Sequence, residues 1–170
     1  GGRWCPYGMG GSSPDLAIDQ REDDGRSICF DGPILTDPLP ILGAPTISLR
    51  FAINQSQGLI VVRLMDVAPD GTSKRVSYGL INVTHCKDHE NIEPMVPDEW
   101  SDVQIPLNDL AHRFSVGHKI RVAISTAYWP IVWPSPTAVN LSIATGDSTI
   151  NLPVRKTALD EAPDFLIPEM

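Results

Sequence analysis

Most of this chain is divided into short runs in which apolar and polar residues alternate, and each run is closed by turn-forming residues. The clearest run covers residues 47–53, where large apolar side chains take every second position. Successive side chains of a strand point to opposite faces, so this pattern predicts a strand with one buried face. The 13 glycines and 16 prolines are spread along the chain, which favours many turns and few long helices. The sequence is therefore typical of a protein built from short strands.

We expect about eight strands, at residues 27–30, 47–53, 58–67, 74–85, 100–107, 117–126, 139–143 and 150–154. One helical turn is expected at residues 107–113, with Asn108 as its N-cap. Many short strands at regular spacing indicate an all-β fold, either a β-sandwich or a barrel.

The run at residues 58–67 is apolar on both faces except for Arg63 and Asp66. A strand of this kind lies centrally in a sheet or beneath another domain. It is followed by the Pro-Asp-Gly turn of residues 69–71, where proline presets φ and glycine supplies a positive φ. We therefore predict an antiparallel hairpin that pairs this run with residues 74–85.

The composition divides the chain into three parts. Residues 1–26 are rich first in Gly, Pro and Ser and then in charge, so we expect a linker from an upstream domain or a segment that lies over a neighbouring part. Residues 27–156 contain the predicted strands, and residues 157–170 form an acidic, proline-containing tail. A length of 170 residues suits one domain with a full-sized core. Because the chain begins at Gly1 without an initiator methionine, we expect a piece of a longer protein.

The charge balance and the cysteines limit the partners and the compartment. Thirteen basic residues against 21 acidic ones give a net charge of -8, which disfavours nucleic acid and anionic membranes as partners. The sequence has no apolar run of the roughly 18 residues that a membrane helix needs and no secretory signal pattern. Cys5, Cys29 and Cys86 are an odd number without metal-type spacing. We therefore expect no disulfide and a reducing compartment, the cytoplasm.

A nucleophile for hydrolysis is the first chemistry to look for. A nucleophile elbow needs Gly-x-Ser-x-Gly between a strand and a helix. The nearest string is residues 10–14, where Ser12 and Ser13 precede a proline and no strand or helix follows. We therefore expect no catalytic residue here, and no enzymatic activity of this chain alone.

Two groups of polar residues contain side chains that can act as metal ligands. His85 and His89 are four apart, but that spacing aligns ligands only on a helix, and a strand running into a loop is expected here. Cys86 between them lacks an evident base. Asp66 and Asp70 flank the predicted turn, where Asp70 should cap the turn and Asp66 should accept hydrogen bonds inside the sandwich. We expect no metal and no cofactor at either place.

The most unusual string runs from Trp129 to Pro136 and follows Tyr128 at the end of a predicted strand. Two tryptophans in a proline-stiffened loop are unfavourable in water, since each ring buries about 150–250 Å² when covered. Three interpretations stay open. The loop folds back over its own sandwich, docks onto another domain, or provides a platform that stacks on sugar rings.

Several ordered motifs resemble one family. Residues 66–71, 117–126 and 128–130 resemble the C-terminal domain of X-Pro dipeptidyl-peptidases and CocE/NonD (cocaine esterase-like) serine hydrolases. Residues 19–21 and 37–39 are similar to the start of that domain. The resemblance extends over roughly residues 15–155, and it rests on several motifs at matching spacing.

The resemblance implies a jelly-roll β-sandwich, similar to galactose-binding-like domains. It implies that the sandwich packs on an upstream α/β-hydrolase domain that carries a Ser-Asp-His triad and a helical cap. Enzymes of this family cleave esters or amides, including X-Pro bonds. The triad belongs to the upstream part, so no catalytic residue is carried over to this sequence.

We therefore expect a non-catalytic C-terminal domain that supports and shapes the active site of a serine hydrolase. The expected partner is the upstream α/β-hydrolase domain, and a homodimer of the isolated domain is a further expectation. The residues expected at the domain interface are Trp4, Tyr128, Trp129, Ile131, Val132 and Trp133. The alternative is an independent carbohydrate- or ligand-binding module that uses Trp129 and Trp133; a third interpretation is a stand-alone enzyme.

Overall fold

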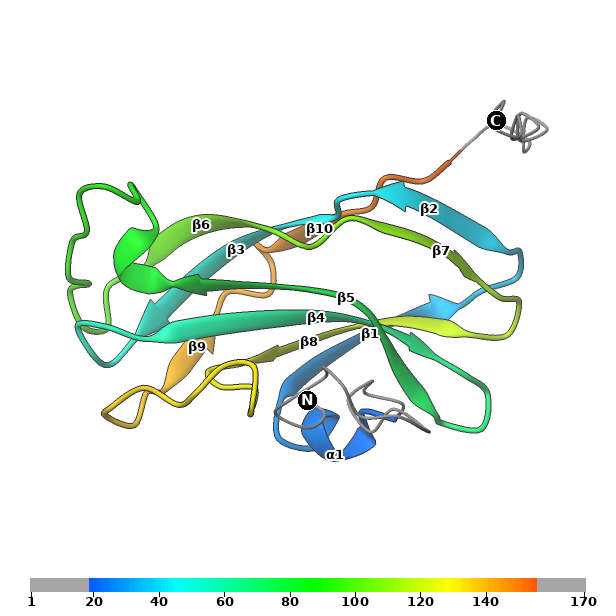
Figure 1. Cartoon of the computed structure of the whole chain (residues 1–170), viewed down its shortest axis with the longest axis horizontal. Helices are drawn as coiled ribbons and strands as arrows, with labels where there is room; N and C mark the ends of the chain where they lie inside the picture. Colours follow the sequence, from blue (N-terminus) through cyan, green and yellow to red (C-terminus); the bar gives the residue numbers. More distant parts are fainter. Residues whose placement is uncertain (1–18, 156–170) are drawn as a thin grey trace, which may run out of the picture.

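A computed structural model describes residues 19–155 and shows two layers of antiparallel strands packed face to face (Figure 1). The all-β prediction is confirmed, and the fold is a β-sandwich. The helical elements are α1 (Arg21–Asp24) and the 3-10 turn η1 (Val83–His85). The strands are β1 (Ile28–Ile34), β2 (Leu39–Gly43), β3 (Thr46–Ile53), β4 (Leu59–Val67), β5 (Ser73–Asn82), β6 (Ser101–Pro106), β7 (Leu110–Phe114), β8 (Lys119–Ser125), β9 (Leu141–Ile143) and β10 (Thr149–Asn151).

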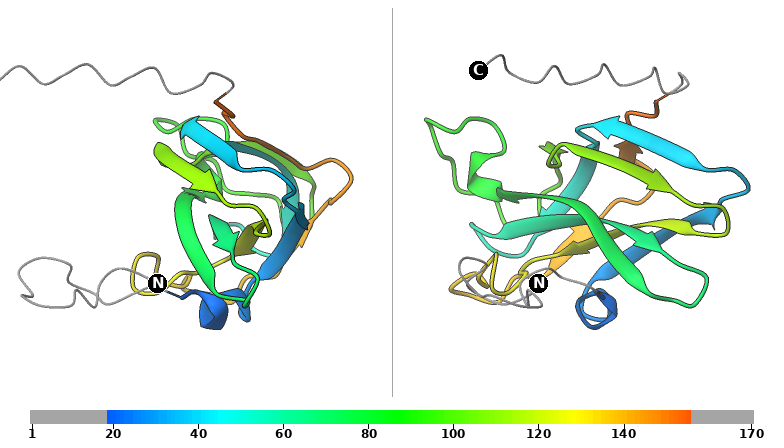
Figure 2. Two further views of the ribbon diagram at one scale, coloured as in Figure 1. Left: turned by 90° about the vertical axis from the view of Figure 1, so that its right-hand side faces the viewer. Right: turned by 45° about the vertical axis from the view of Figure 1, so that its right-hand side comes forward.

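Three sheets make up the two layers. One layer is a four-stranded sheet in the order β1-β8-β4-β5. The other contains the sheet β10-β3-β6, with β9 also paired to β3, and the two-stranded sheet β2-β7. Figure 2 shows the sandwich from its end and from an oblique angle, with the β2–β7 pair in the layer opposite β5. Among residues 19–155, no helix is long and apolar enough to cross a membrane.

The apolar core lies between the layers. On β3 the predicted alternation is confirmed, because Ile47, Leu49, Phe51 and Ile53 are all buried and face the core. Strand β4 contributes the opposite wall through Ile60, Val62 and Leu64. Burial of each such side chain stabilises the fold by about 1.5–3 kcal/mol, so the facing rows of β3 and β4 hold the layers together.

The predicted hairpin is confirmed. Strand β4 pairs antiparallel with β5 from Leu59↔Asn82 to Val67↔Ser73. Gly71 has φ +86° in the connecting turn, as a Pro-Asp-Gly turn requires. The Asp70 side chain accepts a hydrogen bond of 2.9 Å from the backbone N–H of Thr72, which is the turn-capping role predicted for it.

The predicted helical turn at residues 107–113 is wrong. Residues Leu110–Phe114 form β7, which pairs with β2 at Leu39–Gly43, and β2 was not predicted either. Both strands have only five residues, and Pro40 interrupts the pattern of β2. Each becomes a strand because it finds the other, which buries Ile41 and Phe114 under the opposite layer. A pairing between distant segments overrides local propensity here.

The last two predicted strands exist but are shorter than expected. Strand β9 starts at Leu141, and β10 covers Thr149–Asn151. They do not pair with each other; both lie along β3, at its two halves.

The structure differs from the expected linker at residues 19–26. Arg21–Asp24 form helix α1, and the side chains of Gln20 and Asp24 are buried. The backbone N–H of Gln20 donates a 2.8 Å hydrogen bond to the carbonyl of Ser73. These residues therefore cover one face of the sandwich and form part of the folded domain. The rest of the expected linker and the expected tail lie outside the described residues.

Candidate functional site

Strand β4 is buried on both faces, as its sequence predicted, and it lies centrally between β8 and β5. Its outer face carries Val61, Arg63 and Met65, which point away from the core. Residues 19–27 and the loop after β8, at residues 126–140, cover this face. We call the second segment the Trp loop.

A buried ionic cluster holds residues 19–27 on this outer face. The Arg63 side chain is fully buried, and its guanidinium lies 3.0 Å from the Asp24 carboxylate. Arg121 approaches the other oxygen of Asp24 at 3.1 Å, and the Ser73 hydroxyl donates to that oxygen at 2.6 Å. Arg63 also donates to the Ser27 hydroxyl at 2.9 Å. Because a buried charge needs a partner, these contacts fix the segment firmly against the sheet.

Arg121 extends the cluster toward the solvent. It makes a two-pronged contact with Asp31 on β1, with N···O distances of 2.6 and 2.9 Å. The Arg121 hydrogen bond lowers the pKa of the Asp31 carboxyl below its ordinary value of 3.8. Burial and the neighbouring Asp24 charge raise the pKa of the Cys29 thiol, so this cysteine stays a protonated, poorly nucleophilic group.

Tyr128 joins the Trp loop to the same face. Its hydroxyl donates a 2.5 Å hydrogen bond to the side-chain carbonyl of Gln20 and accepts a 2.7 Å hydrogen bond from Arg75. The Arg63 guanidinium lies 4.9 Å from the centre of the Tyr128 ring. Burial raises the pKa of the Tyr128 hydroxyl, and the nearby Arg75 and Arg63 charges oppose that rise only in part. The hydroxyl is therefore protonated and serves as a hydrogen-bond donor.

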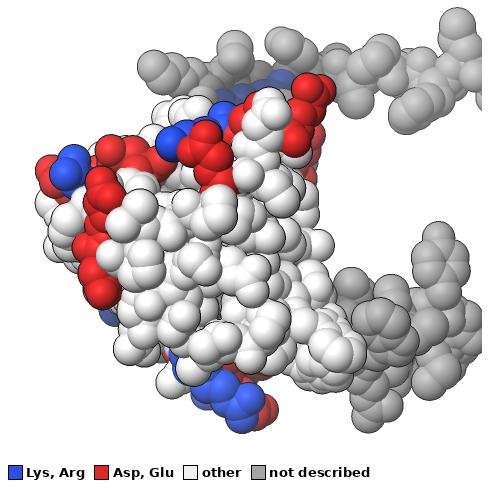
Figure 3. Space-filling view, turned by 90° about the vertical axis from the view of Figure 1, so that its left-hand side faces the viewer, with Lys and Arg blue, Asp and Glu red and all other residues white. Residues whose placement is uncertain are grey.

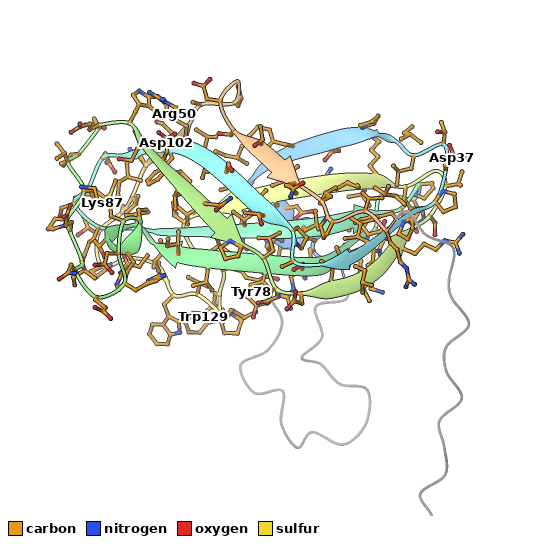
Figure 4. The ribbon with its side chains drawn as sticks, turned by 90° about the horizontal axis from the view of Figure 1, so that it is seen from above. Asp37, Arg50, Tyr78, Lys87, Asp102 and Trp129 are labelled. Atoms are coloured by element: carbon orange, nitrogen blue, oxygen red, sulfur yellow. The ribbon has the colours of Figure 1, made fainter. Side chains whose placement is uncertain are left out.

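The Trp loop turns its residues in two directions. Tyr128 and Val132 exchange backbone hydrogen bonds of 2.8 and 2.7 Å, and both are buried against Val61. Trp129 and Trp133 are 57% and 61% exposed, and their rings contact each other with centroids 4.8 Å apart and planes tilted by 52°. Figure 4 shows Trp129 projecting away from the ribbon of the sheets.

The residues expected at an interface are thus divided by the structure. Tyr128 and Val132 belong to the interior of the domain itself, whereas Trp129, Ile131 and Trp133 are exposed. We call these three residues the Trp surface. Trp4, the other residue expected there, lies outside the described residues.

The Trp loop itself carries no charge. Between Arg121 and Asp147 the sequence contains no Asp, Glu, Lys, Arg or His. Figure 3 views the molecule from the end at which the Trp loop lies, and it shows a broad uncharged face bordered by acidic and basic side chains. An uncharged face with exposed aromatic rings is suited to contact with another protein surface.

Asp66 makes the hydrogen bonds that the sequence predicted, inside the far end of the sandwich. Its two carboxylate oxygens lie 2.8 Å from Nε2 of His112 and 2.7 Å from Nδ1 of His118. The His112 ring also packs edge-on against Phe114. This cluster connects β4, β7 and the turn before β8, so it ties the two layers together.

The His85–His89 region lies in the exposed loop that follows β5. The two Nδ1 atoms are 3.4 Å apart, and the rings are tilted against each other. Within the described part of the chain, no group of three or more His, Cys, Asp or Glu side chains could hold a metal ion. Burial raises the pKa of the Cys86 thiol to about 11. Cys29 and Cys86 are both free thiols, while Cys5, Ser12 and Ser13 lie outside the described residues.

Sequence reasoning identified the exposed tryptophans but missed Gln20, Arg75 and Asp24. The buried Arg63 was visible as a charge in an apolar run, and such a charge signals a partner. Nothing in the sequence says that the partner is Asp24 or that Gln20 meets Tyr128, because these pairs are far apart along the chain.

The model of one protein family, the X-Pro dipeptidyl-peptidase C-terminal non-catalytic domain, matches residues 7–161. The chain is 26% identical over 125 residues to a cocaine esterase from Rhodococcus sp. (strain MB1 Bresler), covering 72% of this chain and 21% of that protein. It thus spans about a fifth of the length of that relative.

Solved structures share the fold. An α-amino acid ester hydrolase superposes with a TM-score of 0.77 at 24% identity, over 84% of this chain and 28% of that one. An aminopeptidase from a marine sediment archaeon of the Thaumarchaeota superposes with a TM-score of 0.79 at 21% identity, over 88% of this chain and 30% of that one. In both, the matched part is a minor share of a longer chain.

Proposed function

The chain belongs to the family of X-Pro dipeptidyl-peptidase C-terminal non-catalytic domains, and on this premise we propose that it docks onto the α/β-hydrolase domain of a longer serine hydrolase. The Trp surface makes the contact, and residues 19–27 bring the chain from the hydrolase domain onto the sandwich. The role of the domain is to support the catalytic part and to help shape its active site. The catalytic triad belongs to the upstream domain.

The observation that carries the proposal is the pair of exposed indole rings on an anchored loop. Apolar burial contributes roughly 25 cal/mol per Å², so covering both half-exposed rings stabilises a complex by on the order of 5 kcal/mol. Tyr128 and Val132 already fix the loop to the sandwich, so little conformational entropy is lost on docking. A rigid, uncharged, aromatic surface of this kind is typical of a contact with another protein domain.

The ring geometry disfavours the sugar-binding alternative. The Trp129 and Trp133 rings contact each other at a centroid distance of 4.8 Å, with their planes tilted by 52°. They therefore do not form the open, level platform that stacks on a run of sugar rings. The surface supports a protein contact better than a carbohydrate contact.

We propose that the longer enzyme cleaves an ester or an X-Pro amide bond. The cocaine esterase and the α-amino acid ester hydrolase are esterases by name, and the archaeal enzyme is named as an aminopeptidase. All of these reactions attack a carbonyl carbon, and a serine nucleophile serves that chemistry.

The test compares two polypeptides that carry Trp129→Ala together with Trp133→Ala. In the present chain the melting temperature should stay almost unchanged, because both rings are exposed. In the longer polypeptide that includes the hydrolase domain, the same double change should lower the melting temperature and increase cleavage by protease between the domains. Trp100→Ala is the matched control, since Trp100 is 47% exposed but lies before β6, outside the Trp surface.

Two outcomes contradict the proposal. If the double change destabilises the present chain as much as the longer polypeptide, the loop belongs to the domain's own core. If soluble oligosaccharides change the tryptophan fluorescence of the present chain, and the double change abolishes that response, the carbohydrate-binding alternative is favoured.

A further inference from the structure

Three segments that are far apart in the sequence meet at one hydroxyl group. Gln20 precedes α1, Arg75 lies on β5, and Tyr128 follows β8. The Tyr128 hydroxyl donates to the Gln20 side chain at 2.5 Å and accepts from Arg75 at 2.7 Å. The hydroxyl therefore has a fixed partner on each side.

Both sides of this junction are held by the sandwich. Gln20 is 2% exposed, and its backbone N–H is bonded to the Ser73 carbonyl on β5. Tyr128 is 3% exposed, and its ring lies beneath the Arg63 guanidinium of β4. Buried polar groups are costly to leave without partners, so the Gln20–Tyr128 hydrogen bond is maintained as long as the segments are in place.

The backbone transmits this position to the indole rings. Tyr128 and Val132 exchange two backbone hydrogen bonds and so close the loop between them. Trp129 directly follows the first of these residues, and Trp133 directly follows the second. A shift of Tyr128 therefore changes the relative placement of the two rings.

We infer that Tyr128 is a positioning residue: its hydroxyl, held between Gln20 and Arg75, sets the arrangement in which the loop presents Trp129 and Trp133. It also ties this loop to the segment through which the chain reaches the sandwich. The functional meaning of this inference rests on the docking proposal above. If the loop docks, two attachments of the upstream domain are held together by this hydroxyl. One is the covalent connection through residues 19–27, and the other is the non-covalent contact through the Trp loop.

Circular dichroism of the present chain can test the inference without the hydrolase domain. Two indole rings in contact couple their excited states and give a paired positive and negative band in the far ultraviolet. The amplitude of this couplet depends on the distance and angle between the rings. Trp133→Phe should abolish the couplet and defines its zero level, whereas Trp100→Phe should leave it intact.

Tyr128→Phe keeps the buried ring and removes only the hydroxyl. We expect it to lose most of the couplet while the cooperative thermal unfolding of the domain is retained. Gln20→Leu should cause the same loss from the other side of the hydrogen bond. The double variant should lose little more than either single variant, because the Tyr128–Gln20 hydrogen bond is the interaction that both changes remove. Each change also removes one separate contact, from Arg75 to Tyr128 or from Arg63 to Gln20.

Tyr78→Phe is the matched control. Tyr78 is the other tyrosine that Arg75 covers, at 4.8 Å from its ring, and it lies outside the junction. Its couplet should equal that of the unchanged chain. An unchanged couplet in folded Tyr128→Phe overturns the inference, and if that variant does not fold, an unchanged couplet in Gln20→Leu overturns it equally.

The result is separable from the docking proposal. If the couplet is lost but the longer polypeptide tolerates the Trp129 and Trp133 changes, Tyr128 positions the loop and the docking proposal fails. If the longer polypeptide is sensitive to those changes but the couplet survives in both variants, docking stands and the inference about Tyr128 fails.

Discussion

The two faces of β4 are buried in different ways. The inner face presents Ile60, Val62 and Leu64 to the apolar side chains of the opposite layer. The outer face presents the fully buried Arg63 to Asp24, and it is covered by residues 19–27 and the Trp loop rather than by a second sheet. The inner face is closed by the main apolar core, whereas the outer face combines ion pairs and hydroxyl contacts with two small apolar clusters around Val61 and Met65.

The difference indicates what each face specifies. Apolar packing is non-directional, so the inner face stabilises the sandwich and tolerates substitutions that conserve volume. Ion pairs and hydrogen bonds have fixed geometry, so the outer face determines where two segments outside the sheets lie. The segments placed in this way are those that we propose to connect the domain to the hydrolase domain.

The largest expected effect comes from disrupting the ionic cluster on the outer face of β4. Asp24→Ala leaves the Arg63 and Arg121 charges without their shared carboxylate, which should cost about 3–5 kcal/mol of unfolding free energy. Adding Arg63→Met removes the stranded charge and should restore a large part of the loss. Denaturant unfolding measures both variants, and Glu22→Ala on the exposed side of α1 is the control. A double variant less stable than Asp24→Ala would contradict this account.

The sequence predicted the inner face better than the outer face. The alternation at residues 47–53 reflects one buried and one open side, a local consequence of strand geometry that needs no knowledge of partners. The β2–β7 pair was missed because neither strand is long or regular enough to be recognised without the other.

The candidate site was predictable only where its residues are unusual by themselves. Trp129 and Trp133 stand out in any sequence, and they are the exposed part of the site. The contacts of Gln20 with Tyr128 and of Asp24 with Arg63 depend on how distant segments meet. No periodic pattern encodes such a meeting, so these contacts required the structure.

The second prediction concerns the inner face. Leu64 is fully buried, so Leu64→Ala should cost about 2–5 kcal/mol through lost apolar contact and a residual cavity. Leu64→Met conserves volume and should cost less than about 1.5 kcal/mol. We expect no second substitution to restore the stability lost in Leu64→Ala. In contrast, Arg63→Met should restore a large part of the stability lost in Asp24→Ala. Unfolding free energies from denaturant titration decide this, and a large loss in Leu64→Met would show that the inner face also depends on exact geometry.

The third prediction concerns Gly71, which lies in a turn and on neither face of β4. Its substitution gives a reference value for the stability changes expected on the two faces. A Cβ added at Gly71 would meet nothing within 4 Å, but the residue has φ +86°. Gly71→Ala should therefore cost about 1–3 kcal/mol through backbone strain alone. Gly146→Ala is the matched control, since a Cβ there also meets nothing within 4 Å and no positive φ is required. Equal melting temperatures for the two variants would contradict a strained turn.

The smallest expected effect lies at the rim of the outer face, where Arg121 meets Asp31. This pair is partly exposed, so it should contribute only about 0.2–1 kcal/mol. The Arg121 hydrogen bond lowers the pKa of Asp31 in the folded protein below its ordinary value of 3.8. The unfolded chain therefore takes up a proton first as the pH falls. The contribution of the pair is complete above 3.8 and disappears as the pH falls through the lower, folded value.

Asp31→Asn tests the direction of this pH dependence. The variant should be slightly less stable than the unchanged chain at neutral pH, and the difference should vanish in acid, where the carboxylate of the unchanged chain is protonated as well. High salt at neutral pH should shrink the same difference, because a partly exposed ion pair is screened. A difference that persists unchanged in acid would mean that Asp31 acts through packing instead of charge. The outer face would then end at the buried cluster of Asp24, and its directional contacts would not extend to the solvent.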